Sequence, residues 1–314
     1  MQYNKLGQSG LKVSEISLGS YLTFGERVNE SDSVRTIHKA FDLGINSFDT
    51  ANVYQQGEAE RILAKALKSF ARDDYVIATK AFWATSKGPN SRGLSRKHLV
   101  EQVHQSLKRM KLDYVDIFYC HSYDYETPVE ETLRTLDDLI KQGKILYVGV
   151  SNWNSEQLQE AIQISDKFLF NRIIVNQCEY SLLKPDIEDT IIPDSEKLGL
   201  SQIVFSPLAQ GILTGKYNKQ IPELSRATNP NINKFFTSLF TKESLRKAQQ
   251  LENLAGEFDL SLTELALSWV LRKNNIASAL MGASSPKQVE ENVKRLNKQL
   301  TSEMLTEITK IYNS

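Results

Sequence analysis

Short apolar segments typical of strands alternate with helix-like segments along almost the whole of this 314-residue chain. In the helix-like segments, apolar residues recur at the spacing of one helix face. Eight strand segments are present, and no Pro- or Gly-rich linker divides them. They span residues 16–18, 46–48, 76–79, 115–120, 145–150, 173–176, 203–205 and 277–281.

Helices are predicted after seven of these strands, and a long insertion follows the strand at 203–205. Strands that alternate with helices imply a parallel sheet, and eight such units in about 300 residues close a (β/α)8, or TIM, barrel. A doubly wound open sheet is the alternative, but the first strand is not followed by the Gly-x-Gly-x-x-Gly motif of its dinucleotide-binding form. The predicted helices span residues 31–43, 58–67, 95–108, 129–142, 155–164, 186–198 and 286–296.

Further elements flank the predicted barrel. Residues 3–6 and 12–15 surround a Gly-Gln-Ser-Gly tetrapeptide that suits a tight reversal, which predicts an N-terminal β-hairpin acting as a cap. Long loops within a compact domain tend to be lids or binding loops. Although the length allows two domains, we expect residues 1–314 to form one α/β barrel domain. Extra helices are predicted at 241–258, 261–273 and 301–311, and long loops at 83–94 and 208–242.

Charge and cysteine content narrow the class of function. The chain has 38 basic and 38 acidic residues, so it has no net charge that would favour nucleic acid or an anionic membrane. Its two cysteines, Cys120 and Cys178, lie in apolar strand segments and form no disulfide or zinc pattern. No stretch approaches the roughly 20 apolar residues that cross a bilayer, and the N-terminus lacks the apolar core of a signal peptide. A cytoplasmic protein that acts on a small molecule is expected.

Polar residues follow the predicted strands directly. In a (β/α)8 barrel the carboxyl ends of all strands meet on the face where chemistry takes place. Each residue alone has a structural explanation, since an Asp often caps a helix and a Lys is often solvated. Their joint occurrence at successive strand ends favours an active site instead. The residues are Gly19, Ser20, Asp49, Lys80, His121, Ser151, Asn152, Gln177, Ser206 and 282–284, with Tyr54 five positions beyond Asp49.

Four of these side chains suit proton transfer. A phenol has a pKa near 10, and a nearby ammonium such as that of Lys80 is expected to lower the pKa of Tyr54. Asp49 would hold the ammonium, and His121 would hydrogen-bond a substrate oxygen or tune the phenol. This set protonates an oxygen while its carbon is reduced, so the hydride must come from a cofactor. The other histidines, His38, His98 and His104, are expected on helix surfaces.

On these residues, the sequence resembles the aldo-keto reductases over essentially its full length. The family tetrad of Asp, Tyr, Lys and His matches Asp49, Tyr54, Lys80 and His121, within the segments FDTANVY (48–54) and CHS (120–122). Further similarity lies in GVSNW (149–153), NQCEY (176–180) and FSPL (205–208). Within the family, LGSYLTFG (18–25), PLAQG (207–211) and GAS (282–284) are most similar to the branch of potassium-channel β subunits and their bacterial relatives.

The resemblance implies that NADP(H) lies across the barrel mouth. Ser151, Asn152 and Gln177 would hold the carboxamide and Phe205 would stack on the nicotinamide, whereas residues 206–216 and Arg226 would surround the pyrophosphate. Many relatives clamp the 2′-phosphate with Lys and Arg where this chain has Gly282 and Gln288, although Lys287 and Arg226 could compensate. The implied contacts are Gly19, Ser20, Tyr21, Asp49, Ser151, Asn152, Gln177, Phe205, Ser206, Pro207, Leu208, Gln210, Gly211, Lys216, Arg226, Gly282, Ser284, Gln288, Glu291 and Asn292.

Two functions compete. The first is an NADP(H)-dependent reductase that converts aldehydes or ketones to alcohols, with Tyr54 as proton donor and a small-molecule carbonyl as substrate. The second is a cofactor-sensing regulatory subunit of a potassium channel, for which a homo-oligomer or a channel-like partner is expected; the channel subunits carry Asn in place of His121, which favours catalysis here. A metal-dependent hydrolase is disfavoured because His121 has no partner at ligand spacing. Substrate selectivity is expected from Tyr21, Phe24, Phe82, Trp83 and residues 235–240.

Overall fold

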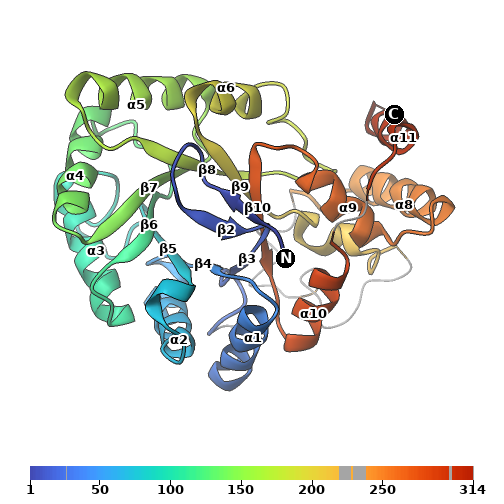
Figure 1. Cartoon of the computed structure of the whole chain (residues 1–314), viewed down its shortest axis with the longest axis horizontal. Coiled ribbons are helices and arrows are strands. Elements are labelled where there is room, and N and C mark those ends of the chain that lie inside the picture. Colours follow the sequence, from blue (N-terminus) through green and yellow to red (C-terminus); the bar gives the residue numbers. More distant parts are fainter. Residues whose placement is uncertain (26, 219–227, 229–237, 297–298, 314) are drawn as a thin grey trace.

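Eight parallel strands close into a barrel in the computed structural model, as Figure 1 shows, so the predicted (β/α)8 fold is confirmed. The structure describes all residues except 26, 219–227, 229–237, 297–298 and 314. Each strand pairs with its sequence neighbour, and the last returns to pair with the first. The strands are β3 (Ile16–Gly19), β4 (Ser47–Asp49), β5 (Val76–Ala81), β6 (Val115–Cys120), β7 (Ile145–Ser151), β8 (Ile173–Glu179), β9 (Ser201–Phe205) and β10 (Ile276–Gly282).

Helices surround the strands (Figure 1) because each connection between parallel strands must return across the outside of the barrel. Their starts are marked by capping residues, such as Asn154, whose side chain accepts a hydrogen bond from the Gln157 backbone N–H. The surrounding helices are α1 (Glu30–Asp42), α2 (Glu58–Leu67), α3 (Arg96–Met110), α4 (Val129–Lys141), α5 (Ser155–Phe168), α6 (Ile191–Leu198) and α10 (Pro286–Lys294).

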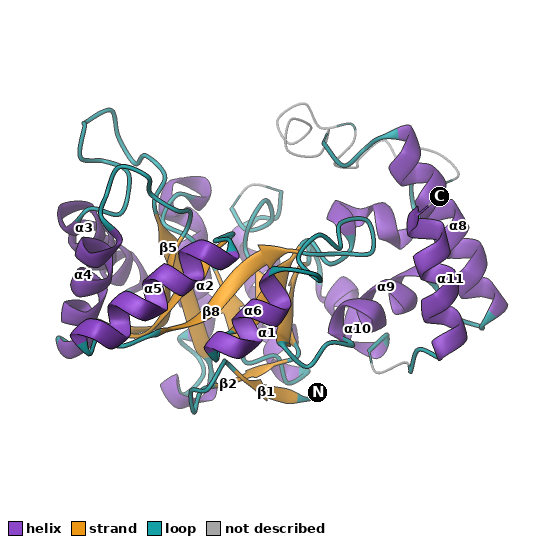
Figure 2. Cartoon of the chain, turned by 90° about the horizontal axis from the view of Figure 1, so that it is seen from above, coloured by secondary structure: helices purple, strands orange, loops and turns teal. Residues whose placement is uncertain are grey.

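The predicted N-terminal hairpin is confirmed and lies across the amino end of the barrel, below the strands in Figure 2. It consists of β1 (Tyr3–Lys5) and β2 (Lys12–Ser14). The Asn4 side chain donates a hydrogen bond to the Ala277 carbonyl at 2.9 Å. Leu6 and Val13 are fully buried against the residues inside the barrel. The hairpin therefore closes one end, which leaves the carboxyl ends of the strands as the open face.

Three further helices lie beside the barrel: α8 (Lys242–Glu257), α9 (Leu262–Leu271) and α11 (Ser302–Asn313), as predicted. Ser261 and Glu264 form a reciprocal capping box at the start of α9. Across the described residues, no helix has the length and apolar character needed to cross a bilayer. The long loop after β9 begins with a 3-10 segment, Ala209–Thr214, before it enters the residues that are not described.

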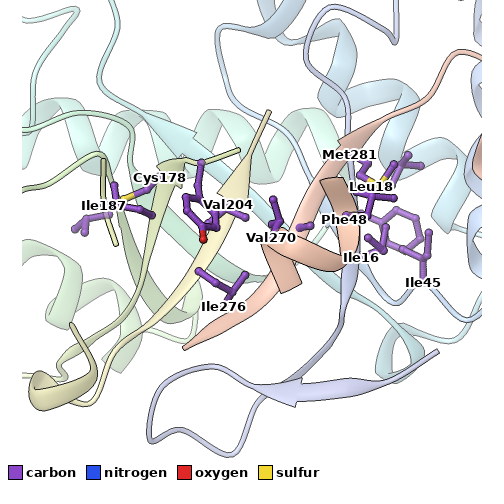
Figure 3. Packing of buried hydrophobic residues seen from close by; sticks show 14 of the residues in the cluster. Ile16, Leu18, Ile45, Phe48, Cys178, Ile187, Val204, Val270, Ile276 and Met281 are labelled. Carbon is purple, nitrogen blue, oxygen red and sulfur yellow. The ribbon is translucent and has the colours of Figure 1, made fainter. Parts of the chain in front are cut away.

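Alternation along the strands divides the core into two clusters. Val76, Ala78 and Tyr119 point into the barrel, whereas Phe48 and Ile77 face the helices. Figure 3 shows part of the outer cluster, where side chains from β3, β4 and β10 pack together. Inside, a Cβ at Gly149 would lie 2.4 Å from the Tyr119 ring, so only glycine leaves room for that ring.

Three predictions about local structure were wrong. The helix expected at 186–198 begins at Ile191, because a longer helix would place Pro193 in its interior, where the ring clashes with the preceding turn. His98 is buried at 1% exposure, since it lies on the face of α3 that packs inward. Phe24 and Phe82, both expected at the mouth, are 1% and 6% exposed and belong to the outer hydrophobic cluster.

A buried ion pair joins α2, α3 and β5. Glu60 is fully buried, its carboxylate pairs with Arg109, and it accepts a hydrogen bond from the Thr79 hydroxyl at 2.7 Å. The Arg109 side chain also packs against Gly57. A Cβ on Gly57 would lie 2.6 Å from the Arg109 Cδ, so a larger residue would displace this side chain. Gly57 has a φ of 87° and precedes α2, so this contact fixes the loop that carries Tyr54.

Replacing Arg109 with Leu should lower the free energy of unfolding by about 3–5 kcal/mol, because the charge of Glu60 would be buried without a partner. Urea denaturation measures this change. Arg61→Leu is a matched control on α2, the helix that carries Glu60, since Arg61 pairs with Glu58 at the surface and its loss should cost less than about 1 kcal/mol. Equal losses in the two variants would contradict the importance of the buried pair.

Candidate active site

The carboxylate and ammonium predicted at the strand ends meet inside the barrel. Asp49 ends β4, and Lys80 is the fifth residue of β5, on the same face as Val76 and Ala78. Both side chains therefore point inward, where they form a buried ion pair; Lys80 is 0% and Asp49 5% exposed. The Lys80 ammonium also donates to the Thr50 carbonyl oxygen at 2.9 Å.

Two residues from other strands, β8 and β6, complete the surroundings of this pair. Gln177 on β8 donates from Nε2 to the second carboxylate oxygen of Asp49 at 3.0 Å. The Lys80 Nζ lies 5.8 Å from the centre of the Tyr119 ring. Tyr119 and the Thr50 carbonyl were missed from the sequence, although Tyr119 could have been found from its inward position on β6, one residue before the strand ends.

The phenol and the imidazole lie beside this ion pair, on the loops that follow β4 and β6. The Tyr54 hydroxyl and the His121 Nε2 are 3.3 Å apart, within hydrogen-bond distance. The Tyr54 ring centre lies 5.1 Å from the Lys80 Nζ. His121 follows the last residue of β6, and its backbone N–H donates to the Ala81 carbonyl oxygen at 3.1 Å. The structure thus brings all four predicted side chains together.

The loop that carries Tyr54 has an unusual backbone held by hydrogen bonds. Gln55 and Gln56 have φ values of 48° and 54°, in the left-handed region. Just before them, Asn52 is buried and donates from its side chain to the Gln102 amide oxygen on α3 at 2.8 Å. The Asn52 N–H donates to the Lys80 carbonyl oxygen. These contacts fix the phenol relative to the ammonium.

Burial dominates the electrostatics of the site. It raises the pKa of Tyr54 well above its ordinary value, and the negative charge of Asp49 raises it further. Burial likewise lowers the pKa of Lys80, an effect that the charge of Asp49 opposes. Burial and then the positive charge of Lys80 hold the pKa of His121 well below its usual range. At neutral pH the phenol is therefore protonated and the imidazole is uncharged.

The expected lowering of the Tyr54 pKa by Lys80 is accordingly wrong for the protein alone. The main reason is burial of the phenol, which disfavours its charged form, and the negative charge of Asp49, the partner of Lys80, raises the pKa further. A protonated phenol and a neutral imidazole can both donate hydrogen bonds to a single oxygen placed between them. The arrangement is suited to stabilise a developing negative charge on that oxygen and then to protonate it.

The predicted nicotinamide contacts lie at the carboxyl ends of four strands. The Ser20 hydroxyl is buried and has no hydrogen-bond partner among the described residues. The Ser151 hydroxyl donates to the Gln177 carbonyl oxygen at 3.0 Å. Asn152 and Ser206 have φ values of 54° and 56°, which turn the chain sharply as it leaves β7 and β9. Phe205, the last residue of β9, is partly exposed, whereas the other four residues of this strand are buried.

The predicted pyrophosphate segment is a compact turn with left-handed residues. Gln210 and Gly211 have φ values of 55° and 102° within the 3-10 segment after β9. A Cβ on Gly211 would lie 2.9 Å from the Lys216 Nζ, so glycine permits a lysine ammonium to approach the backbone. Pro207 is buried, Leu208 is partly buried, and Lys216 is exposed. Arg226, predicted nearby, lies outside the described residues.

The predicted adenosine end lies between β10 and α10. The Ser284 backbone N–H and hydroxyl both donate to the Gln288 Oε1, at 2.9 and 3.2 Å. Gly282 is exposed, Glu291 is partly buried, and Asn292 is buried at 7% exposure. Like these groups, the unpartnered Ser20 hydroxyl and the close turn at Gly211 follow the carboxyl ends of strands, at the open face of the barrel. The residues present therefore fit a dinucleotide.

Aromatic rings line the opening beside Tyr54. Tyr21 lies 4.9 Å from Tyr54 between ring centres and is 43% exposed. Trp83 is 48% exposed, 6.4 Å from the His121 ring and 5.0 Å from Phe82. Of the expected segment 235–240, residues 235–237 lie outside the described part of the chain. Within that part, no group of three or more His, Cys, Asp or Glu side chains could hold a metal ion.

Two imidazoles, the buried one of His98 and the partly buried one of His121, should make stability depend on pH. Burial lowers the pKa of His98, as it does that of His121. Below about pH 6.5 the unfolded chain therefore binds protons that the folded chain does not, and the free energy of unfolding falls by up to about 1.4 kcal/mol per pH unit for each residue. Denaturation between about pH 5.5 and 7 measures the slope.

His98→Gln and His121→Gln should each reduce that slope, whereas His104→Gln is the matched control, because His104 is exposed on α3. A slope that persists unchanged in the His98 and His121 variants would contradict the assignment.

Comparisons with known proteins agree with the geometry. The family model described as "Aldo/keto reductase family" matches residues 15–313. A "Probable voltage-gated potassium channel subunit beta" of Oryza sativa subsp. japonica is 39% identical over 320 residues, which cover 100% of this chain and 97% of that protein. A protein of the same description from Arabidopsis thaliana is 40% identical over 301 residues, covering 95% and 92%.

A "Putative voltage-gated potassium channel subunit beta" of Schizosaccharomyces pombe is 39% identical over 322 residues, covering 98% of this chain and 92% of that protein. The family model and these relatives each span nearly the whole chain, in agreement with the barrel and with the four side chains at its open face. The chain belongs to the aldo/keto reductase family.

Proposed function

We propose that the protein is an NADP(H)-dependent reductase that converts aldehydes or ketones to alcohols. The observation that carries the proposal is the 3.3 Å contact between the Tyr54 hydroxyl and the His121 Nε2, beside the buried pair of Lys80 and Asp49. Membership of the aldo/keto reductase family supports an oxidoreductase. A cytoplasmic location is part of the proposal.

The residues have distinct roles in the proposed reaction. NADPH, when bound, supplies the hydride that forms the new C–H bond at the carbonyl carbon. The carbonyl π electrons move to the oxygen, which accepts hydrogen bonds from the Tyr54 hydroxyl and the neutral His121. Tyr54 then gives its proton to that oxygen, and solvent restores the phenol. Lys80 stabilises the phenolate that forms, and Asp49 keeps Lys80 charged and in place.

The proposed cofactor contacts come from the family resemblance, and an unpartnered buried hydroxyl at Ser20 supports a ligand at this face. Ser151, Asn152 and Gln177 would orient the carboxamide, and Phe205 would stack on the ring. The turn at residues 206–211 and Lys216 would surround the pyrophosphate. Ser284, Gln288 and Asn292 would hold the adenosine end, with Lys287 supplying positive charge for the 2′-phosphate.

Replacing Tyr54 with Phe should lower NADPH-dependent turnover of small aldehydes by about 10²–10⁴-fold, because the proton donor is lost while the ring remains. NADPH oxidation is followed by absorbance, and cofactor affinity by protein fluorescence, which should not change. Tyr312→Phe is the matched control on α11, remote from the mouth. Equal turnover in the Tyr54 variant and the unchanged protein would overturn the proposed function.

The preference for NADPH over NADH tests the adenosine end separately. Lys287 is exposed on α10, 3.9 Å from Glu291. Lys287→Gln should weaken NADPH binding by about fivefold, since a solvent-exposed ion pair contributes up to roughly 1 kcal/mol, and should leave NADH binding unchanged. Lys294→Gln on the same helix is the matched control, because Lys294 pairs with Glu290 instead. Equal affinity of the unchanged protein for both cofactors would contradict NADP(H) as the cofactor.

A second candidate function is a cofactor-sensing regulatory subunit of a potassium channel. The names of the three relatives, each a channel subunit beta, favour it. In this case, the protein would form an oligomer or a complex with a channel, and reduction would be slow. Good turnover by a protein that sizing experiments find only as a free monomer would count against it.

A further inference from the structure

Asp124 joins two of the loops at the open face of the barrel. One oxygen, Oδ2, accepts hydrogen bonds from the Leu94 backbone N–H at 2.7 Å and the Thr127 hydroxyl at 2.8 Å. The other, Oδ1, accepts from the Glu126 N–H at 3.0 Å. Leu94 ends the loop after β5, whereas Asp124 and Thr127 lie in the loop after β6. The carboxylate therefore ties one loop to the other.

The packing at this contact is close. Gly93 has a φ of 90°, and a Cβ on it would lie 2.6 Å from the Asp124 Oδ2. The Gly93 N–H donates to the Phe82 carbonyl oxygen at 2.7 Å, which brings the two ends of the loop at residues 83–92 together. The Leu94 carbonyl oxygen accepts from the Thr132 hydroxyl at 3.2 Å on α4. The base of this loop is thus clamped on both sides.

The clamped loop begins with the aromatic residue that faces the reacting groups. Trp83 is half exposed, and its ring centre lies 6.4 Å from that of His121. His121 precedes Asp124 by three residues in the second loop. Burial alone would raise the pKa of Asp124, but the hydrogen bonds from Leu94 and Thr127 lower it overall, so the group is a carboxylate at neutral pH. Hydrogen bonds to an ionised acceptor are stronger than those between neutral groups.

We propose that Asp124 is a positioning residue that holds Trp83 beside His121 and thereby sets selectivity for carbonyl substrates that carry a planar apolar group. This inference rests on the proposed reductase function. Among the described residues, no hydrogen bond joins Asp124 to the Tyr54 hydroxyl or the His121 ring, so Asp124 acts through the loops. A flat substrate would pack against Trp83, whereas a small aliphatic aldehyde would make little use of that contact.

Asp124→Asn tests the inference with little change in volume. An amide has a single acceptor oxygen, so its NH2 group would face the N–H of Leu94 or of Glu126, and the tie between the loops would weaken. With NADPH, we expect kcat/KM for benzaldehyde to fall about tenfold and kcat/KM for propanal to fall less than about twofold. Asp73→Asn is the matched control, since Asp73 is an exposed aspartate at the other end of the barrel.

A double-variant cycle separates positioning from a general loss of structure. Trp83→Ala should remove the preference for benzaldehyde, and adding Asp124→Asn to it should cause no further loss. Losses that are equal for the two aldehydes, or that simply add in the double variant, would overturn the proposal.

Tryptophan fluorescence gives a readout that does not require turnover. The difference between the emission of the unchanged protein and that of Trp83→Phe isolates Trp83, because Trp153 and Trp269 are common to both. Asp124→Asn should shift this difference toward longer wavelength as Trp83 meets more water. If the unchanged protein reduces neither aldehyde, the proposed function is wrong, and an unchanged Trp83 emission in Asp124→Asn would then overturn the positioning role independently.

Discussion

The ion pair of Lys80 and Asp49 is the interaction on which the site depends. Two charges inside a barrel cost several kcal/mol each in lost hydration, and they are tolerated only when they are paired and hydrogen-bonded. Asp49 and Lys80 satisfy this condition through each other, the Gln177 amide and the Thr50 carbonyl. The buried pair forms a charged and hydrogen-bonded group at the carboxyl ends of the strands. The side chains of Tyr54 and His121 lie beside this group, on the loops that follow.

The barrel makes this arrangement possible through strand alternation. Side chains at every second position point inward, so Val76, Ala78 and Lys80 form a column from the closed to the open end. The hairpin closes the lower end, and Gly149 makes room for the Tyr119 ring. The loops that follow β4 and β6 then add the side chains of Tyr54 and His121 at the open face. Contacts of Asn52 with Gln102 and of Asp124 with Leu94 hold two of these loops in place.

The sequence predicted the order of strands and helices because the strands are short apolar segments, whereas the helices repeat apolar residues along one face and most of them begin at a capping residue. It also identified the residues that follow the strands, since the carboxyl ends of parallel strands must meet. The prediction of burial failed for His98 and Phe24. Both side chains are buried by contacts with segments far away in the sequence, which no local pattern shows. The pKa of Tyr54 was predicted in the wrong direction because the sequence does not show how deeply the phenol is buried, and burial disfavours its charged form more than a nearby ammonium favours it.

The most direct test of the account removes both charges beneath the phenol at once. The double variant Asp49→Asn, Lys80→Met leaves no unpaired buried charge, so it should fold and bind NADPH. Single-turnover oxidation of bound NADPH by benzaldehyde should then slow by at least about 100-fold, because the phenolate formed at Tyr54 loses its counter-charge. A rate close to that of the unchanged protein would contradict the central claim that this ion pair supports proton transfer from Tyr54.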